Sequence, residues 1–266
     1  MLWELIKAII LGIVEGLTEF LPVSSTGHLI LVNQWLAYSD EFTVLFDVFI
    51  QLGAILAVII YFRNEIFPPN PAHLIKKEFL LFWSKILTAF VPAVICGLLF
   101  ASFIEERLFN VLTVSISLFA GGVLLILLDR KERTGKVFSV QEMSYQTALY
   151  IGLFQCLAMV PGTSRSAATI IGALVLGCSR KLAAEFSFYL AIPTILAASV
   201  YSLAKSQAHF NLNNFLILAT GFIVTFFVAM AVIKFLMSFI KKHSFVAFGY
   251  YRIVLAIIFF VWLYHQ

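Results

Sequence analysis

The chain has 266 residues, of which 62% are hydrophobic and only 12% charged, and it carries a net charge of +4. A soluble domain carries roughly 25% charged residues, so this composition argues against a soluble protein and indicates an integral membrane protein. The basic residues are not gathered into one patch, which argues against a nucleic-acid-binding surface. The three cysteines lie in apolar segments without paired spacing, which argues against a disulfide framework or a zinc site.

The first apolar region, 3–38, is interrupted midway by the polar run EGLTEFLPVSSTGH. Each half is too short to span a bilayer comfortably, so we expect two half-helices joined by a turn, either re-entrant or broken. Pro22 ends the first half, because a proline cannot donate the backbone hydrogen bond of a helix. We expect Ser24 to Gly27 to form the turn, and the second half-helix to begin at His28 behind a Ser or Thr cap.

Three uninterrupted apolar stretches follow, each long enough to cross a membrane. A second interrupted region, 147–179, then carries the polar run PGTSRSAAT, and three further spans close the chain. In this second run we expect a turn at 161–162, a cap at 163–164 and a helix from Arg165. The expected spans cover 42–62, 79–101, 108–128, 186–204, 215–237 and 245–264.

The order of these pieces repeats, because each half has a broken pair followed by three spans. An ungapped alignment of the halves places Gly12 on Gly152 and Ser24 on Ser164. Internal repeats with broken helices are typical of membrane proteins that bind ligands near the bilayer midplane. We therefore predict one all-α polytopic membrane domain built from two repeats. The predicted domain covers 1–266, and its repeats cover 1–128 and 141–266.

The loop charges predict how the two halves are oriented. Lys and Arg residues concentrate in alternate loops, and an excess of these residues marks the cytoplasmic side. The repeats should therefore have inverted topology, which brings the two broken segments toward each other from opposite faces. The basic residues of the loops predicted to be cytoplasmic, including the joining loop 129–140, are Arg63, Lys76, Lys77, Arg130, Lys131, Arg133, Lys136, Lys241 and Lys242.

The two polar runs combine groups that are suited to phosphate chemistry. Glu15 and Glu19 are four residues apart and share a helix face, and two carboxylates in apolar surroundings need a shared proton or a cation such as Mg²⁺. Arg165 matches phosphate oxygens bidentately, with a structural pair to a glutamate as the alternative. His28 lies one turn past Ser25, where it can act as a base toward that hydroxyl or as an acid toward a leaving group.

The other hydroxyls of the runs are expected to hold substrate oxygens at two helix N-termini, where unpaired N–H groups favour anions. Helix capping alone is the alternative for these hydroxyls. Gln51, inside a span, is expected to orient substrate or to join two helices. Arg252 is expected to snorkel to the interface or to anchor a structural pair. The residues expected to bind substrate are Ser24, Thr26, Gly162, Ser164, Ser166, Thr169 and Gln51.

The run EGLTEFLPVSSTGH resembles the first signature of the bacterial undecaprenyl-diphosphate phosphatases, the bacitracin-resistance family, and PGTSRSAAT resembles the second. FDVFIQLGAILAV at 46–58 and AAEFSFYLAIP at 183–193 also resemble family blocks, so the similarity covers essentially the whole chain. The resemblance implies a hydrolase that converts C55 isoprenyl diphosphate to the monophosphate, recycles the lipid carrier of wall polymers and confers bacitracin resistance. It also implies a multi-pass protein of the bacterial plasma (inner) membrane, with an active site open to the external face and the lipid tail between helices.

The same resemblance assigns roles to individual residues. It implies Mg²⁺ or Ca²⁺ at the paired acids Glu15 and Glu19, Ser25 as the nucleophile, His28 as an essential histidine and Arg165 as the phosphate-binding arginine. Attack by His28 or by a metal-bound water stays open as the alternative. The rival class is a secondary transporter or flippase of a polyprenyl phosphate, since inverted repeats also build transporters. The expected partners are the lipid substrate and the membrane, without nucleic acid, and the sequence leaves a homodimer open.

Overall fold

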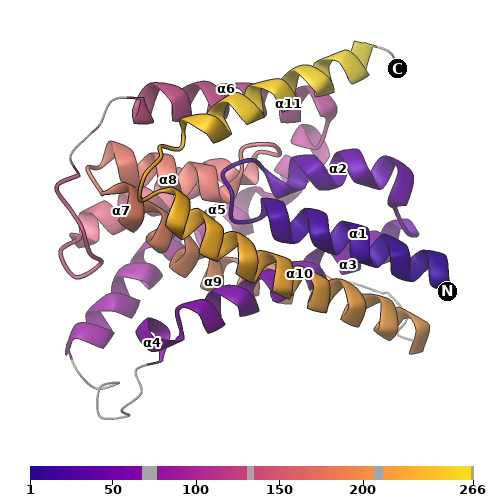
Figure 1. Cartoon of the computed structure of the whole chain (residues 1–266), viewed down its shortest axis with the longest axis horizontal. Coiled ribbons are helices and arrows are strands. Elements are labelled where there is room, and N and C mark those ends of the chain that lie inside the picture. Colours follow the sequence, from indigo (N-terminus) through magenta and orange to yellow (C-terminus); the bar gives the residue numbers. More distant parts are fainter. Residues whose placement is uncertain (68–76, 131–134, 206–211, 265–266) are drawn as a thin grey trace.

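The computed structural model describes residues 1–67, 77–130, 135–205 and 212–264, and these fold almost entirely into α-helices (Figure 1). Six of the described helices are long and apolar enough to cross a membrane, and they coincide with the six predicted spans. The chain is therefore an all-α, multi-pass membrane protein. The spanning segments are Phe42–Tyr61, Lys77–Ile104, Val111–Asp129, Arg180–Ala204, Leu212–Phe239 and Val246–Tyr264.

Each interrupted region forms two short helices joined by a turn, as the polar runs predicted. The first pair is α1 (Leu2–Thr18) and α2 (Ser25–Leu36), and the second pair is α7 (Tyr145–Cys156) and α8 (Arg165–Val175). A 3₁₀ turn, Leu157–Met159, extends α7. The four helices are shorter than the roughly 20 residues of a comfortable membrane span, so each pair places its turn inside the protein.

The remaining helices join these pairs into one bundle. Pro92 and Pro193 lie inside two of the long helices, where each proline removes one backbone hydrogen-bond donor of its helix. Within the described parts of the chain no β-strand forms, and one isolated bridge joins Val137 to Cys178. These helices are α3 (Asp40–Tyr61), α4 (Arg63–Ile66), α5 (Lys77–Leu108), α6 (Val111–Asp129), α9 (Arg180–Lys205), α10 (Leu212–Phe239) and α11 (Val246–Tyr264).

Equivalent helices of the two halves pack in equivalent ways. Helix α1 packs along α10, its counterpart α7 packs along α5, and α6 lies beside α11 (Figure 1). The aligned glycines permit two of these contacts: a Cβ at Gly12 would lie 2.9 Å from the Gly221 carbonyl on α10, and one at Gly152 would collide with the Ala89 backbone on α5. Both halves therefore use a glycine for close helix approach.

The opposite orientation of the halves across a membrane stays a prediction. It depends on the charges of the loops, and Lys76, Lys131 and Arg133 lie outside the described residues. The joining loop predicted at 129–140 is likewise described only in part.

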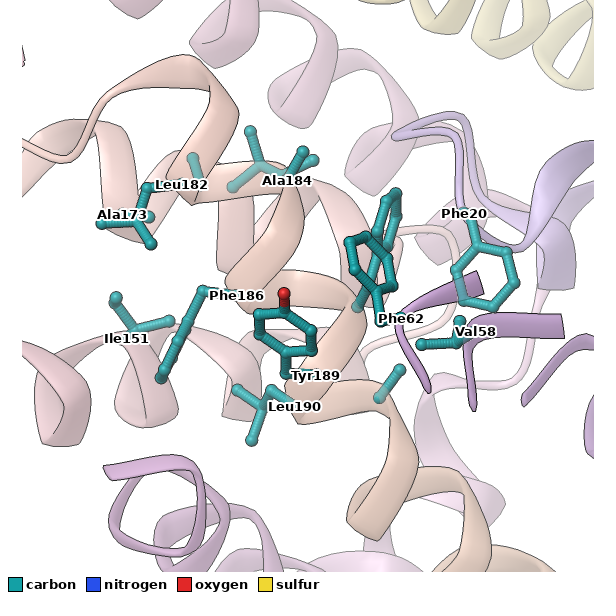
Figure 2. Close-up of a cluster of buried hydrophobic side chains, with 14 of the residues drawn as sticks. Phe20, Val58, Phe62, Ile151, Ala173, Leu182, Ala184, Phe186, Tyr189 and Leu190 are labelled. Carbon is teal, nitrogen blue, oxygen red and sulfur yellow. The ribbon is translucent and has the colours of Figure 1, made fainter. Parts of the chain in front are cut away.

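The turn after α1 is fixed by a buried apolar cluster. Phe20 is fully buried and meets Phe188 of α9 edge to face, with ring centroids 5.2 Å apart. Phe62, at the end of α3, packs against Phe188 and against Tyr189 at 5.0 Å. Figure 2 shows Phe20, Phe62 and Tyr189 gathered near Val58, and Phe188 belongs to the same buried cluster. Because Phe20 follows Glu19 directly, this packing also fixes the position of that carboxylate.

Candidate active site

The first turn ends in a strained serine that caps α2. Ser24 has φ = 74°, in the left-handed region that side chains other than glycine rarely adopt. Its hydroxyl oxygen accepts from the Gly27 amide at 3.2 Å, so it acts as the N-cap and Ser25 becomes the first residue of α2. The expectation that this helix begins at His28 is therefore wrong, because the cap lies at Ser24 and the helix starts three residues earlier.

The second turn repeats this conformation. Ser164 has φ = 68° and its hydroxyl accepts from the Ala167 amide at 3.2 Å, so Arg165 is the first residue of α8, as predicted. Ser24 and Ser164 are the only residues other than glycine with positive φ among those described. Each such conformation costs on the order of 1–3 kcal/mol and tends to occur at functional sites. The strain marks the two turns as equivalent and points to a shared site.

One carboxylate connects the two turns. The Ser25 hydroxyl donates to Glu19 Oε2 at 2.6 Å. Arg165 Nη2 lies 3.3 Å from Glu19 Oε1, and only 11% of the arginine side chain and 6% of the glutamate side chain are exposed. A hydroxyl from one helix N-terminus and a guanidinium from the other therefore meet on a single buried carboxylate.

A residue of α9 supports the Arg165 side chain by a hydrogen bond. Its Nη1 donates to the Ser187 carbonyl at 2.8 Å, and the Thr169 hydroxyl lies 2.7 Å from the Ser187 hydroxyl and 3.0 Å from the Arg165 carbonyl. The Nε–H of Arg165 is buried without a partner among the described residues. A donor in this state is available to an oxygen of a bound anion, and a guanidinium suits phosphate in geometry as well as charge.

Glu15 lies beside Glu19 and lacks a donor. It is fully buried, and both of its carboxylate oxygens are without a hydrogen-bond partner among the described residues. The negative charge of Glu19 also disfavours a second negative charge on Glu15. Two ionised carboxylates cannot donate to each other, so they need a cation or a shared proton between them. If both carboxylates are ionised, one guanidinium faces two negative charges, and a bound cation would offset the repulsion of an anionic substrate.

The donor set fits a hard divalent cation. Across the described residues, no group of three or more His, Cys, Asp and Glu side chains gathers around one point. A cation between Glu15 and Glu19 would therefore complete its coordination with oxygens of substrate or water. Mg²⁺ typically binds in this way, through one or two carboxylates and substrate phosphates.

His28 is held by two partners, neither of which is Ser25. Its Nδ1 lies 2.7 Å from the Ser24 carbonyl and its Nε2 lies 2.6 Å from the Tyr251 hydroxyl. Because a carbonyl only accepts, Nδ1 carries the proton, and Nε2 accepts from the tyrosine. The structure thus pairs the Ser25 hydroxyl with Glu19 instead of His28, and His28 braces the strained Ser24.

Of the other predicted substrate-binding residues, three belong to the turns or to the helix starts that follow them, and Gln51 belongs to α3. Thr26 is exposed on the first turn of α2, while Ser166 is buried and donates to the Leu21 carbonyl at 2.8 Å. Gly162 has φ = 88° and packs so closely on Val114 of α6 that a Cβ would overlap its backbone. Gln51 is half-buried within α3, and no hydrogen bond among the described residues joins it to either turn. The serines therefore lie at the two turns, and Gln51 is not hydrogen-bonded to either turn.

Two contributors, Ser187 and Tyr251, were not predicted from the sequence, and a third, Arg252, has a different role from the expected one. Ser187 supports Arg165, and Tyr251 holds His28. Arg252 was expected to snorkel or to anchor a structural pair, but it is fully buried and donates to backbone carbonyls, so the snorkelling alternative is wrong. A hydroxyl or guanidinium inside an apolar span is itself a signal of function, and Ser187 and Arg252 both carried that signal.

The fold is that of a multi-pass membrane protein, and the buried serine, glutamate and arginine at the two turns are groups suited to a membrane-embedded enzyme that acts on phosphate groups. The chain belongs to the family described as bacitracin resistance protein BacA, which matches residues 8–258. It is 49% identical over 261 residues to the undecaprenyl-diphosphatase of Acetivibrio thermocellus, covering 96% of each chain. It is 48% identical over 263 residues to that of Enterococcus faecalis, covering 96% of this chain and 95% of the relative.

Proposed function

We propose that this chain is an undecaprenyl-diphosphatase, which hydrolyses undecaprenyl diphosphate to undecaprenyl phosphate and inorganic phosphate. The observation that carries the mechanism is the contact of Glu19 with both Ser25 and Arg165, because it joins a nucleophile, a base and a phosphate-binding group in one buried site. Relatives that are nearly half identical over almost the full length carry this name, and the family name implies bacitracin resistance.

In the proposed reaction, Ser25 Oγ attacks the terminal phosphorus. Glu19 takes the hydroxyl proton across the 2.6 Å contact, the oxygen–phosphorus bond forms, and the bond to the bridging oxygen breaks, which releases the lipid monophosphate. Water then attacks the phosphorus of the phosphoserine, the bond from phosphorus to Ser25 Oγ breaks, and Glu19 returns its proton to that oxygen, so that inorganic phosphate leaves and both side chains regain their starting states. Arg165 uses its free Nε–H and one of its two terminal nitrogens to hold the non-bridging oxygens of the phosphate. Positioning and charge stabilisation of this kind supply most of the rate in phosphoryl transfer.

His28 does not need to receive the Ser25 proton in this scheme. With Nδ1 on the Ser24 carbonyl, it keeps the N-cap, and with it the first residue of α2, in place. The unpaired N–H groups at the starts of α2 and α8 add a partial positive charge that favours the diphosphate. The hydroxyls of Ser24 and Ser164 then serve as caps for these helix ends.

Glu15 and Glu19 would hold a Mg²⁺ or Ca²⁺ ion in the proposed enzyme. Such an ion would neutralise the paired carboxylates and help to bind the phosphate oxygens of the substrate. All of the protein groups in this scheme come from one chain, so it does not require a homodimer. The basic loops orient the spans with those loops on the cytoplasmic side. Placement in the plasma (inner) membrane with the site open to the external face is what the resemblance to the bacitracin-resistance family implies.

The function is tested by phosphate release in detergent. Purified protein supplied with undecaprenyl diphosphate and Mg²⁺ is expected to release inorganic phosphate at many turnovers per molecule, and a chelator is expected to stop the release. A secondary transporter has no gradient to use in detergent and would leave the substrate intact. Substrate that remains unhydrolysed by folded protein at saturating Mg²⁺ would reject the proposal in favour of the transporter class.

The cation site is tested by Glu15→Gln. The amide keeps the shape of the side chain but removes one of the two charges that would hold the ion, so we expect the Mg²⁺ concentration for half-maximal phosphate release to rise by about tenfold or more. Gln155, which aligns with Glu15 in the other half, is also buried, and Gln155→Glu serves as the control at the equivalent position. Identical Mg²⁺ titrations of wild type and Glu15→Gln would remove Glu15 from the site.

A further inference from the structure

The guanidinium of Arg252 lies between the two turns, away from the reacting groups. The side chain extends from α11 and is fully buried. Its Nη1 donates to the Pro22 carbonyl at 3.3 Å, and its Nη2 donates to the Gly162 carbonyl at 3.1 Å. Pro22 precedes the strained Ser24, and Gly162 precedes the strained Ser164. One side chain therefore binds both turns at equivalent places.

The other donors of Arg252 attach it to α6. Its Nε lies 3.3 Å from the Leu118 carbonyl, and its Nη2 lies 3.0 Å from the Ser117 carbonyl. Among the described residues, no carboxylate lies within ion-pair distance of it. A buried charge without a counter-ion is costly, and here the four carbonyl oxygens offset that cost. Such an arrangement holds backbone segments in place instead of balancing a side-chain charge.

The protein makes room for this group at one glycine. A Cβ at Gly121 of α6 would overlap the Nη2 atom of Arg252. The guanidinium thus fills the space that a side chain at Gly121 would otherwise take. Gly121 therefore leaves room for the guanidinium, while α6 and α11 approach most closely at Gly122 and Gly249, where a Cβ on either glycine would lie 2.7 Å from the carbonyl oxygen of the other.

We propose that Arg252 is a positioning residue that sets the distance between the two turns, and so between Ser25 and Arg165. This inference deepens the proposed function, because it concerns the geometry of the same site. Only a planar group with several donors can bind carbonyls on two turns and a helix at once, whereas an ammonium is a point charge on a flexible stem. Two other hydrogen bonds join the first turn directly to the start of α8, Ser166 to the Leu21 carbonyl and Arg165 to Glu19. Among the hydrogen bonds of the described residues, those of Arg252 are the ones that attach both turns to a third element.

The expected kinetic result is a loss of turnover without a matching loss of substrate binding. In Arg252→Lys the charge stays, but the turns lose their common support, so we expect kcat to fall by about 10²-fold, the size of effect that a misplacement of about 1 Å produces. KM should change far less, because Arg165 and the helix N-termini remain. Gly121→Ala should produce the same pattern with the guanidinium intact, because the added methyl group displaces it.

A distance measurement tests the inference without using activity. Spin labels at Thr26 and Thr163, in a background lacking the three native cysteines, report the separation of the turns. We expect one narrow distance distribution in the Arg252 parent and a broader one in Arg252→Lys and in Gly121→Ala. If the wild-type chain released no phosphate, the proposed function would fail, and this measurement would still decide whether Arg252 holds the turns.

Arg180→Lys is the matched control. Arg180 also binds a backbone carbonyl, that of Asp129 at 3.2 Å, but it pairs with the Asp129 carboxylate and does not contact either turn. This variant should keep the parental distance distribution and the parental kcat at matched folded yield. Arg252→Lys with an unchanged distribution and unchanged kcat would overturn the inference, and so would a variant that loses only folded yield while its folded fraction turns over normally.

Discussion

Replacing Ser25 by alanine is expected to lower kcat for phosphate release by about 10³-fold or more, which is the scale of losing an activated nucleophile. The hydroxyl lies 2.6 Å from Glu19 at the first position of α2, and its removal leaves no oxygen there to attack phosphorus. Neither the Ser24 cap nor the Arg165 pair depends on this hydroxyl, so the fold should be retained. The measurement is single-turnover phosphate release at matched folded concentration.

Ser199→Ala provides the control for Ser25→Ala. Ser199 is also buried, at 1% exposure, and its hydroxyl has no hydrogen-bond partner among the described residues. Its loss should therefore leave kcat unchanged. A Ser25→Ala enzyme with wild-type turnover would assign the attack to another group, with His28 or a water molecule as the alternatives.

Exchanging Arg165 for lysine is expected to lower kcat by a factor on the order of 10²–10³, similar to the loss of one preorganised oxyanion donor. The lysine keeps a positive charge near Glu19. It lacks the planar guanidinium, however, which in Arg165 binds the Ser187 carbonyl and still has a free Nε–H for phosphate. Arg165→Ala should lower kcat at least as far. Both variants are compared with wild type in kcat, in KM and in thermal stability.

The two Arg165 variants together distinguish a catalytic role of the guanidinium from a structural one. If the guanidinium only balanced Glu19, lysine would restore near-wild-type turnover, and alanine would reduce the folded yield. That outcome would leave phosphate binding to the two helix N-termini and the cation. Arg180→Lys again serves as the comparison, since it makes the same exchange at an ion pair with Asp129.

The case of His28 shows why spacing alone was insufficient at the first turn. The sequence predicted that Ser25 lies in the turn, that a helix begins at His28, and that His28, one turn past Ser25, can act on the Ser25 hydroxyl. The helix begins at Ser25, however, so the Ser24 carbonyl is the local acceptor for Nδ1. The start of the helix was in turn set by the left-handed conformation of Ser24, which the identity of a serine does not predict.

The sequence by itself determined the six spans and the two broken pairs, and it predicted which residues of the two polar runs make up the site. Those features depend on hydrophobicity over windows of about 20 residues and on helix stops and caps, which are local properties of the chain. Tertiary structure alone decided that Glu19 binds both Ser25 and Arg165, that Tyr251 holds His28, and that Arg252 joins the turns. These contacts join segments that are distant along the chain, or side chains whose directions depend on a turn. They follow from how the helices pack, and no local pattern of residues encodes that packing.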